Sequence, residues 1–158
     1  MKFQNVDGVV MDLSAEKPDI EWYNTFPAHG AVYDLTSTAV SGTDIKERVR
    51  AIISLGKSDD PRAVRPLMDL LSDRDPEIRL SSATALGQLK SGRSVEALTG
   101  LLKERSEHIA IRQQAAISLA AIRSTGAIRE MKEFVADKNE EAAIRSYTEE
   151  ILAKIGTW

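Results

Sequence analysis

Residues Ile78–Leu89, with the sequence IRLSSATALGQL, form a pattern that recurs along the chain. Related stretches follow at intervals of 33 residues, as IRQQAAISLAAI at Ile111–Ile122 and IRSYTEEILAKI at Ile144–Ile155. A shorter version, ERVRAIISLG, lies 31 residues upstream at Glu47–Gly56. Each copy has the apolar spacing of an amphipathic helix. A fixed period of this length predicts an all-α fold, a right-handed α-α superhelix in which repeats stack on one another.

A second apolar stripe between the copies predicts that each repeat is a pair of helices, with about four pairs in all. Helix starts are marked by Asp44, Asp60-Pro61 and Asp75-Pro76, because aspartate caps a helix and proline is tolerated at its first position. We expect the last helix to span Asn139–Ile155. The stripes of the first helices consist of Val64, Leu67, Leu70 and Leu71, then Val95, Leu98, Leu101 and Leu102, then Ile128, Met131, Phe134 and Val135.

The chain divides into an irregular amino-terminal arm or cap at residues 1–27 and a repeat domain at residues 28–158. Residues 28–56 read as a degenerate first repeat, in which Thr36–Thr43 is rich in weak helix formers. Trp22 and Phe26 lie four residues apart in the arm. They are predicted either to cover the open end of the repeat core or, together with Tyr23, to anchor a partner.

Composition narrows the classes of function. The chain has 158 residues, no cysteine and a net charge of −3, with no apolar run long enough to span a membrane. Its start does not read as a signal peptide. These features favour a cytoplasmic protein and argue against nucleic-acid binding, which needs a basic face.

The repeats resemble the HEAT-like repeat family, in particular the repeats named after phycobilisome lyases, over about residues 28–156. The residues that carry the resemblance are Val64–Leu71, Asp73, Asp75-Pro76, Ile78-Arg79, Ala83, Leu86-Gly87 and Leu89. The resemblance implies an armadillo-like solenoid whose second helices line the concave side. Because these residues are structural, it implies little about activity.

In such repeats, acidic and arginine residues often form a structural ladder. Here a carboxylate precedes each of three arginines by six or eight residues, in the pairs Asp73 and Arg79, Glu104 and Arg112, and Asp137 and Arg145. With Arg48, the arginines form an evenly spaced row. We expect each pair to be partly buried and to set the stacking angle. An anion-binding row is the alternative.

The sequence offers little that could perform catalysis, and no catalytic, metal or cofactor residue is assigned. The two histidines, His29 and His108, are expected at the surface or in caps. Glu107-His108 is a single pair, in the reverse order of the His-Glu dyads that HEAT-repeat di-iron hydroxylases repeat on several helices. We therefore do not expect an enzyme of that kind.

The leading prediction is a non-catalytic scaffold or adaptor that binds a protein or peptide segment through the concave helices. A mixed apolar and polar groove suits such a partner, and no membrane or small-molecule substrate is indicated. A bilin lyase-like or tetrapyrrole-handling accessory and a nucleic-acid-binding protein are the alternatives. The predicted partner-binding residues are Val49, Ile53, Leu80, Gln113, Gln114, Ile117 and Tyr147.

Overall fold

The structure, a computed structural model, describes residues 2–4, 10–12 and 28–156. The chain divides into two compact units, Met1–Ala31 and Val32–Trp158. In the first unit, β1 (Lys2–Gln4) pairs antiparallel with β2 (Val10–Asp12), with Phe3 opposite Met11. The predicted roles of Trp22, Tyr23 and Phe26 concern residues outside the described ones.

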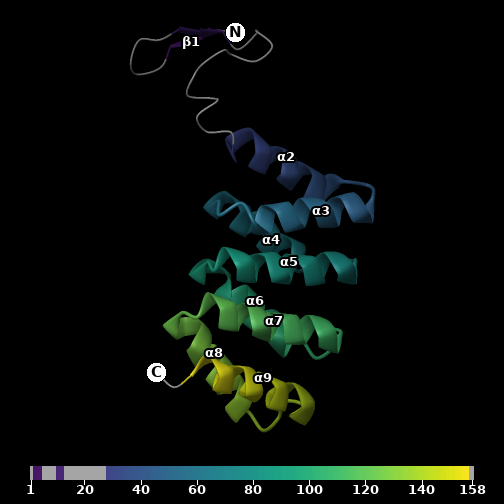
Figure 1. The fold of residues 1–158 in the computed structure, drawn as a ribbon. Helices are drawn as coiled ribbons and strands as arrows, with labels where there is room; N and C mark the ends of the chain where they lie inside the picture. Colours follow the sequence, from purple (N-terminus) through teal and green to yellow (C-terminus); the bar gives the residue numbers. More distant parts are fainter. Residues whose placement is uncertain (1, 5–9, 13–27, 157–158) are drawn as a thin grey trace. The chain divides into compact units, whose positions relative to one another are not determined.

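The described part of the chain contains four successive helix pairs, as the period of the sequence predicts (Figure 1). Short 3-10 turns, η1 (Pro61–Ala63) and η2 (Gly92–Ser94), lead into the first helices of the middle two pairs. The pairs are α2 (Ala28–Ser41) with α3 (Ile45–Gly56), α4 (Val64–Leu70) with α5 (Pro76–Leu89), α6 (Val95–Lys103) with α7 (Ile109–Ile122), and α8 (Thr125–Ala136) with α9 (Ala142–Ile155).

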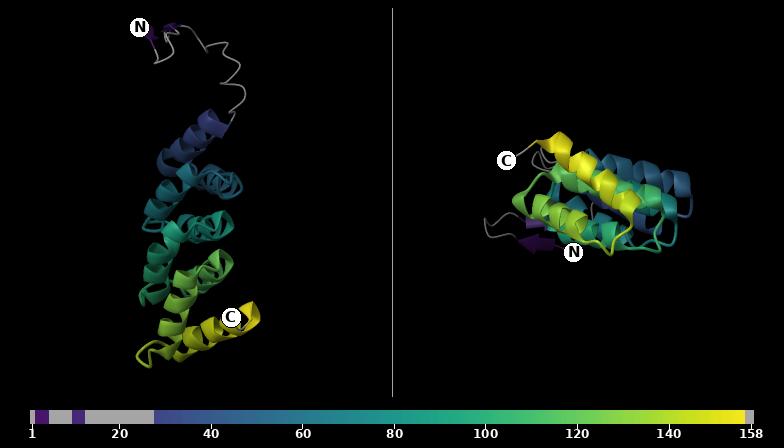
Figure 2. Two further views of the ribbon diagram at one scale, coloured as in Figure 1. Left: turned by 90° about the vertical axis from the view of Figure 1, so that its left-hand side faces the viewer. Right: turned by 90° about the horizontal axis from the view of Figure 1, so that it is seen from below.

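The second helices α3, α5, α7 and α9 contact one another in that order, and α4, α6 and α8 cover one side of this row (Figure 2). The core lies between the two rows. It contains the predicted stripes, with Leu67, Leu98, Met131 and Phe134 at most 1% exposed. The all-α solenoid is therefore confirmed. No helix among the described residues is long and apolar enough to cross a membrane.

The helix boundaries follow from local chemistry. The side chains of Asp44, Asp60 and Asp75 each accept a hydrogen bond from the backbone N–H two residues on, which satisfies one free donor of the helix that begins there. Two second helices end in the left-handed conformation, at Lys90 with φ 51° and Arg123 with φ 56°. These residues reverse the chain without glycine.

Neighbouring second helices approach closely through small residues. A Cβ added to Gly87 of α5 would lie 2.7 Å from Ser118 Oγ and 2.9 Å from Ser118 Cα on α7. A Cβ on Gly56 of α3 would lie 2.9 Å from Ala85 of α5. Ser118 Oγ also donates a buried hydrogen bond of 2.7 Å to the carbonyl of Ala83. The backbones are therefore packed too closely for a larger side chain at either glycine.

The limits of two helices differ from what the local sequence favours. The Thr36–Thr43 stretch is rich in weak helix formers, yet α2 continues into it as far as Ser41. Burial of Val32 and Ala39 against the rest of the stack outweighs propensity there. The last helix begins at Ala142 rather than Asn139, because Asp137 accepts a hydrogen bond from the N–H of Asn139 and closes a turn.

Gly87→Ala should lower the free energy of unfolding by about 1–3 kcal/mol, because the added methyl group overlaps the backbone of α7. Gly100→Ala is the matched control, since Gly100 lies within α6 with no atom within 4 Å of its added Cβ. It should be neutral or stabilising by up to about 1 kcal/mol. Urea unfolding followed by circular dichroism measures both. Equal effects of the two substitutions would contradict the close approach.

Candidate functional site

A row of arginines near the starts of the second helices links the repeats. Arg48 of α3 is 6% exposed. Its Nε donates to the carbonyl of Ala39 at 2.8 Å, and its Nη2 lies 2.6 Å from Asp73 Oδ2 in the next repeat. Burial alone would raise the pKa of Asp73, but the hydrogen bond from Arg48 and a backbone N–H hold that pKa below its usual value.

Arg79 of α5 makes the same kind of link to the third repeat. Its Nε and Nη2 donate to the two carboxylate oxygens of Glu107 at 2.6 and 2.9 Å, and its Nη1 donates to the carbonyl of Asp73 at 2.8 Å. The Glu107 side chain is 6% exposed. The hydrogen bond from Arg79 lowers the pKa of Glu107, and the same bond raises that of Arg79.

Arg112 of α7 is the most deeply buried of the row, at 1% exposure. Its Nε donates to the carbonyl of Leu102 at 2.8 Å. Its two terminal nitrogens each lie 3.4 Å from a carboxylate of the last repeat, Glu140 and Glu141. The buried guanidinium therefore has hydrogen-bond acceptors on three sides, as a cation removed from water requires.

Arg145 of α9 occupies the same position in the last repeat but has weaker partners. Its Nε is buried without a hydrogen-bond partner, and its Nη1 reaches the carbonyl of Asp137 at 3.5 Å. Each of the three earlier arginines pairs with a carboxylate 25 to 29 residues further along the chain. The described residues extend only to Gly156.

The predicted pairing partners differ from those in the structure. Arg79 contacts the backbone of Asp73 rather than its carboxylate, which pairs with Arg48. The carboxylate of Glu104 accepts hydrogen bonds from Ser106, and that of Asp137 from the N–H of Asn139. The reason is geometric: each arginine extends forward to the following repeat, so its carboxylate comes from the residues before the next second helix.

Arg112→Ala should lower the free energy of unfolding by about 3–5 kcal/mol, because Glu140 would keep a buried charge with only the 3.8 Å contact to Arg105. Arg65→Ala is the control, since the Arg65 side chain is 83% exposed and its pair with Asp69 is long, at 3.4 Å. The control should change stability by less than about 0.5 kcal/mol. Thermal and urea unfolding give both values, and similar losses would contradict a structural role for the row.

Glu107→Gln should lower stability at neutral pH and make it less sensitive to acid. The folded-state pKa of Glu107 lies below its ordinary value of 4.5, so its contribution is present above that pH and is lost as pH falls through the lowered pKa. The stability difference between wild type and variant should therefore shrink between about pH 6 and pH 3. Urea unfolding across this range measures it. Parallel curves would show that the Arg79 pair adds nothing.

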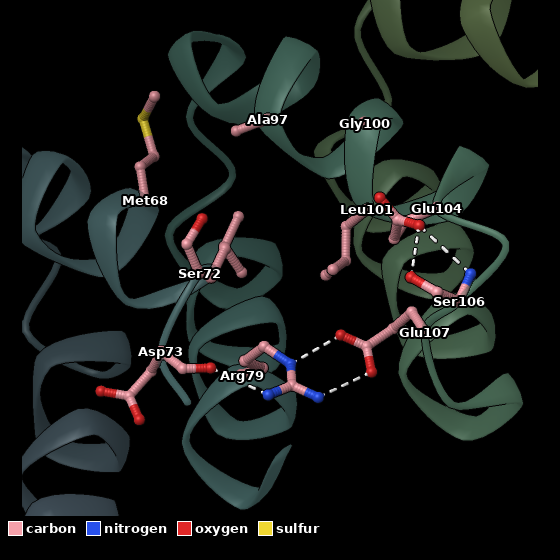
Figure 3. A pocket seen from close by; sticks show the side chains of 11 residues that line it. Met68, Ser72, Asp73, Arg79, Ala97, Gly100, Leu101, Glu104, Ser106 and Glu107 are labelled. Atoms are coloured by element: carbon pink, nitrogen blue, oxygen red, sulfur yellow. Dashed lines mark hydrogen bonds and ion pairs between the residues drawn. The ribbon is translucent and has the colours of Figure 1, made fainter. Parts of the chain in front are cut away.

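A cavity of about 530 Å³ lies beside the Arg79–Glu107 pair. Figure 3 shows apolar side chains of α4 and α6 on one side and the ion pair on the other. The carboxylates of Asp73 and Glu107 are already paired with arginines. Three charged side chains of the cavity, those of Asp73, Arg79 and Glu107, thus hold the repeats together, whereas Glu104 accepts hydrogen bonds from Ser106. Its lining residues are Met68, Leu71, Ser72, Asp73, Arg79, Ala97, Gly100, Leu101, Glu104, Ser106 and Glu107.

The predicted partner-binding residues form rows across the second helices. Ile53 of α3 and Ile117 of α7 occupy one register and are 43% and 41% exposed. Val49 of α3, Leu80 of α5 and Tyr147 of α9 are partly buried and pack on the core. Gln113 and Gln114 are half-buried, and the Gln114 amide donates to Ser118 at 3.2 Å. This surface, called here the second-helix surface, is mixed in polarity. Its binding role stays a prediction.

Metal ligands do not gather in the described residues, where no group of three or more histidine, cysteine, aspartate or glutamate side chains could hold a metal ion. His108 is exposed and precedes α7. Its neighbour Glu107 uses both carboxylate oxygens on Arg79. The side chain of His29 lies outside the described ones.

Stacked helix pairs joined by a repeating arginine define the class of this chain as an α-solenoid. Residues 34–110 match the family model for HEAT repeats. The chain therefore contains HEAT-like repeats, as its sequence pattern indicates.

Two solved structures are similar to this chain. Human deoxyhypusine hydroxylase in complex with glycerol has a TM-score of 0.69 and 22% identity, over 89% of this chain and 44% of that one. The complex of CpcE and CpcF of phycocyanin lyase from Nostoc sp. PCC7120 has a TM-score of 0.62 and 20% identity, over 89% of this chain and 62% of that one. At such identities the likeness shows the fold alone, so the bilin alternative stays untested.

Deoxyhypusine hydroxylase-B of Oryza sativa subsp. japonica is 38% identical over 80 residues, which are 49% of this chain and 26% of the rice protein. The chain thus matches about a quarter of that relative. This finding contradicts the expectation of a non-catalytic scaffold that is not an enzyme. That expectation rested on the absence of repeated His-Glu dyads, and this chain contains only the reversed pair Glu107-His108.

Proposed function

We propose that the chain is part of an enzyme of the deoxyhypusine hydroxylase type, and that its repeats bind and orient the substrate segment. The observation that supports this most directly is the 38% identity over 80 residues to the rice hydroxylase. The substrate would be a polypeptide segment that carries the amino acid deoxyhypusine, which is the group named for that relative.

The described side chains suit binding better than bond breaking. The Glu107 carboxylate is held by Arg79 at 2.6 and 2.9 Å, so it is not free to act as a base or a metal ligand. No metal-dependent step is therefore assigned to the described residues. Groups that perform the chemistry would come from a further lobe or chain, in keeping with the partial coverage of both hydroxylases.

The second-helix surface is the proposed place of contact. Ile53 and Ile117 stay more than 40% exposed, although the apolar residues next to them in sequence pack on the core. Burying two exposed isoleucines against a substrate segment would contribute about 1–2 kcal/mol each. Gln113, with its half-buried amide, can fix the register of an extended chain by hydrogen bonds.

Ile117→Glu should raise the dissociation constant for a deoxyhypusine-bearing polypeptide about tenfold or more, because a carboxylate replaces an apolar contact. Val40→Glu is the matched control, since Val40 is 51% exposed on α2, away from this surface. Fluorescence anisotropy with the labelled polypeptide measures binding to the full chain.

The enzymatic half of the proposal is tested on the same polypeptide. The full chain is incubated with it, iron(II), air and a reductant, with and without the lysate of a cell that makes the protein. Mass spectrometry then looks for a gain of one oxygen atom. Binding with oxygen gain that depends on this chain supports the proposal. Absence of both binding and oxygen gain would overturn it.

A further inference from the structure

Within the described residues, the row of second helices begins with α3 and ends with α9, so the outer edges of these two helices adjoin no further repeat there. Inner junctions show how such edges fit together. On α5, Arg79 holds Glu107, the carbonyl of Ala83 accepts a hydrogen bond from Ser118, and Gly87 lies against Ser118. We call the side of each helix that faces the following repeat its leading edge, and the opposite side its trailing edge.

The leading edge of α9 carries Arg145, Glu149 and Ala153 at the positions that Arg79, Ala83 and Gly87 hold on α5. Glu149 and Ala153 are exposed, and Arg145 keeps a buried Nε without a partner. Every other arginine of the row has a carboxylate in the repeat ahead. This edge therefore carries a guanidinium that has no carboxylate partner among the described residues and, one helical turn away, an exposed carboxylate.

The trailing edge of α3 carries the complementary groups. Arg50 and Ser54 are equivalent to Gln114 and Ser118 of α7. Asp44 is equivalent to His108, the residue that follows Glu107. All three are exposed. A shallow cavity of about 290 Å³ lies along this edge, lined by Leu35 and Thr38 of α2 and by Glu47, Arg50, Ala51 and Ser54 of α3.

Because the two edges are related by the same repeat, we propose that α9 of one copy stacks on α3 of a second copy and continues the row. Asp44 of the second copy faces Arg145, Arg50 faces Glu149, and Ser54 packs on Ala153. Ala120 of α7, at the inner junction with α9, is the residue equivalent to Ala153. Glu149, which would be costly to bury alone, is neutralised by Arg50.

The contact is heterologous, because it joins α9 of one copy to α3 of the next. A growing row of copies therefore always has one free α3 edge and one free α9 edge. Head-to-tail chains of increasing length should form as concentration rises. Opposite charges at the contact should make association weaker at high salt. This inference concerns assembly and does not rest on the enzymatic role proposed above.

The test is sedimentation velocity of the full chain over a wide range of concentration. Wild type should associate, and each single variant, Arg50→Glu or Glu149→Arg, should raise the dissociation constant roughly tenfold or more because like charges meet. The double variant, which has the net charge of wild type, should regain association. Lys132→Glu, at an exposed position of α8, is the control for charge alone.

Circular dichroism first establishes that each variant is folded. Mixing the two single variants should also restore association, because the arginine introduced in one variant then faces the glutamate introduced in the other. A wild-type chain that stays monomeric at every concentration would overturn the proposal. So would single variants that associate as well as wild type, or a folded double variant that fails to recover.

Discussion

The stack depends on a guanidinium that reaches from each of the second helices α3, α5 and α7 into the repeat ahead. A guanidinium out of water needs acceptors on several sides, and its planar fork fixes where they must be. At Arg112 these acceptors are a carbonyl of the preceding helix and carboxylates of the following repeat. One side chain therefore sets the distance within a helix pair and the distance between pairs at the same time.

Small residues along the second helices complement the arginines. At Gly87 and Ser118 the two backbones come within contact distance, which brings Arg79 close enough to Glu107 for two hydrogen bonds of 2.6 and 2.9 Å. A larger residue would separate the helices and lengthen the ion pair. Apolar packing between the rows supplies most of the stability, whereas the arginines and small residues specify one spacing among many.

Features that depend on neighbours in sequence could be predicted. Helix pairs, the caps at Asp44, Asp60 and Asp75, and the buried stripes follow from periods and capping chemistry that a single sequence displays. The partners of Arg79 and Arg112 could not, because the nearest carboxylate in sequence is not the nearest in space. The likeness to a hydroxylase was not predicted either, since the sequence has no repeated His-Glu dyads. Helix α2 extends through Thr36–Ser41 because burial outweighs propensity.

The arginine contacts lengthen from one end of the row to the other. They measure 2.6 Å at Arg48 and Arg79 and 3.4 Å at Arg112, and the Nε of Arg145 has no partner. In a one-dimensional stack each repeat is stabilised by its neighbours alone. Longer arginine contacts toward α9 therefore mean that the free energy of local opening falls toward that end of the stack. Amide hydrogens of α8 and α9 would then exchange with solvent first, and the repeats would unfold one after another from α9 toward α3.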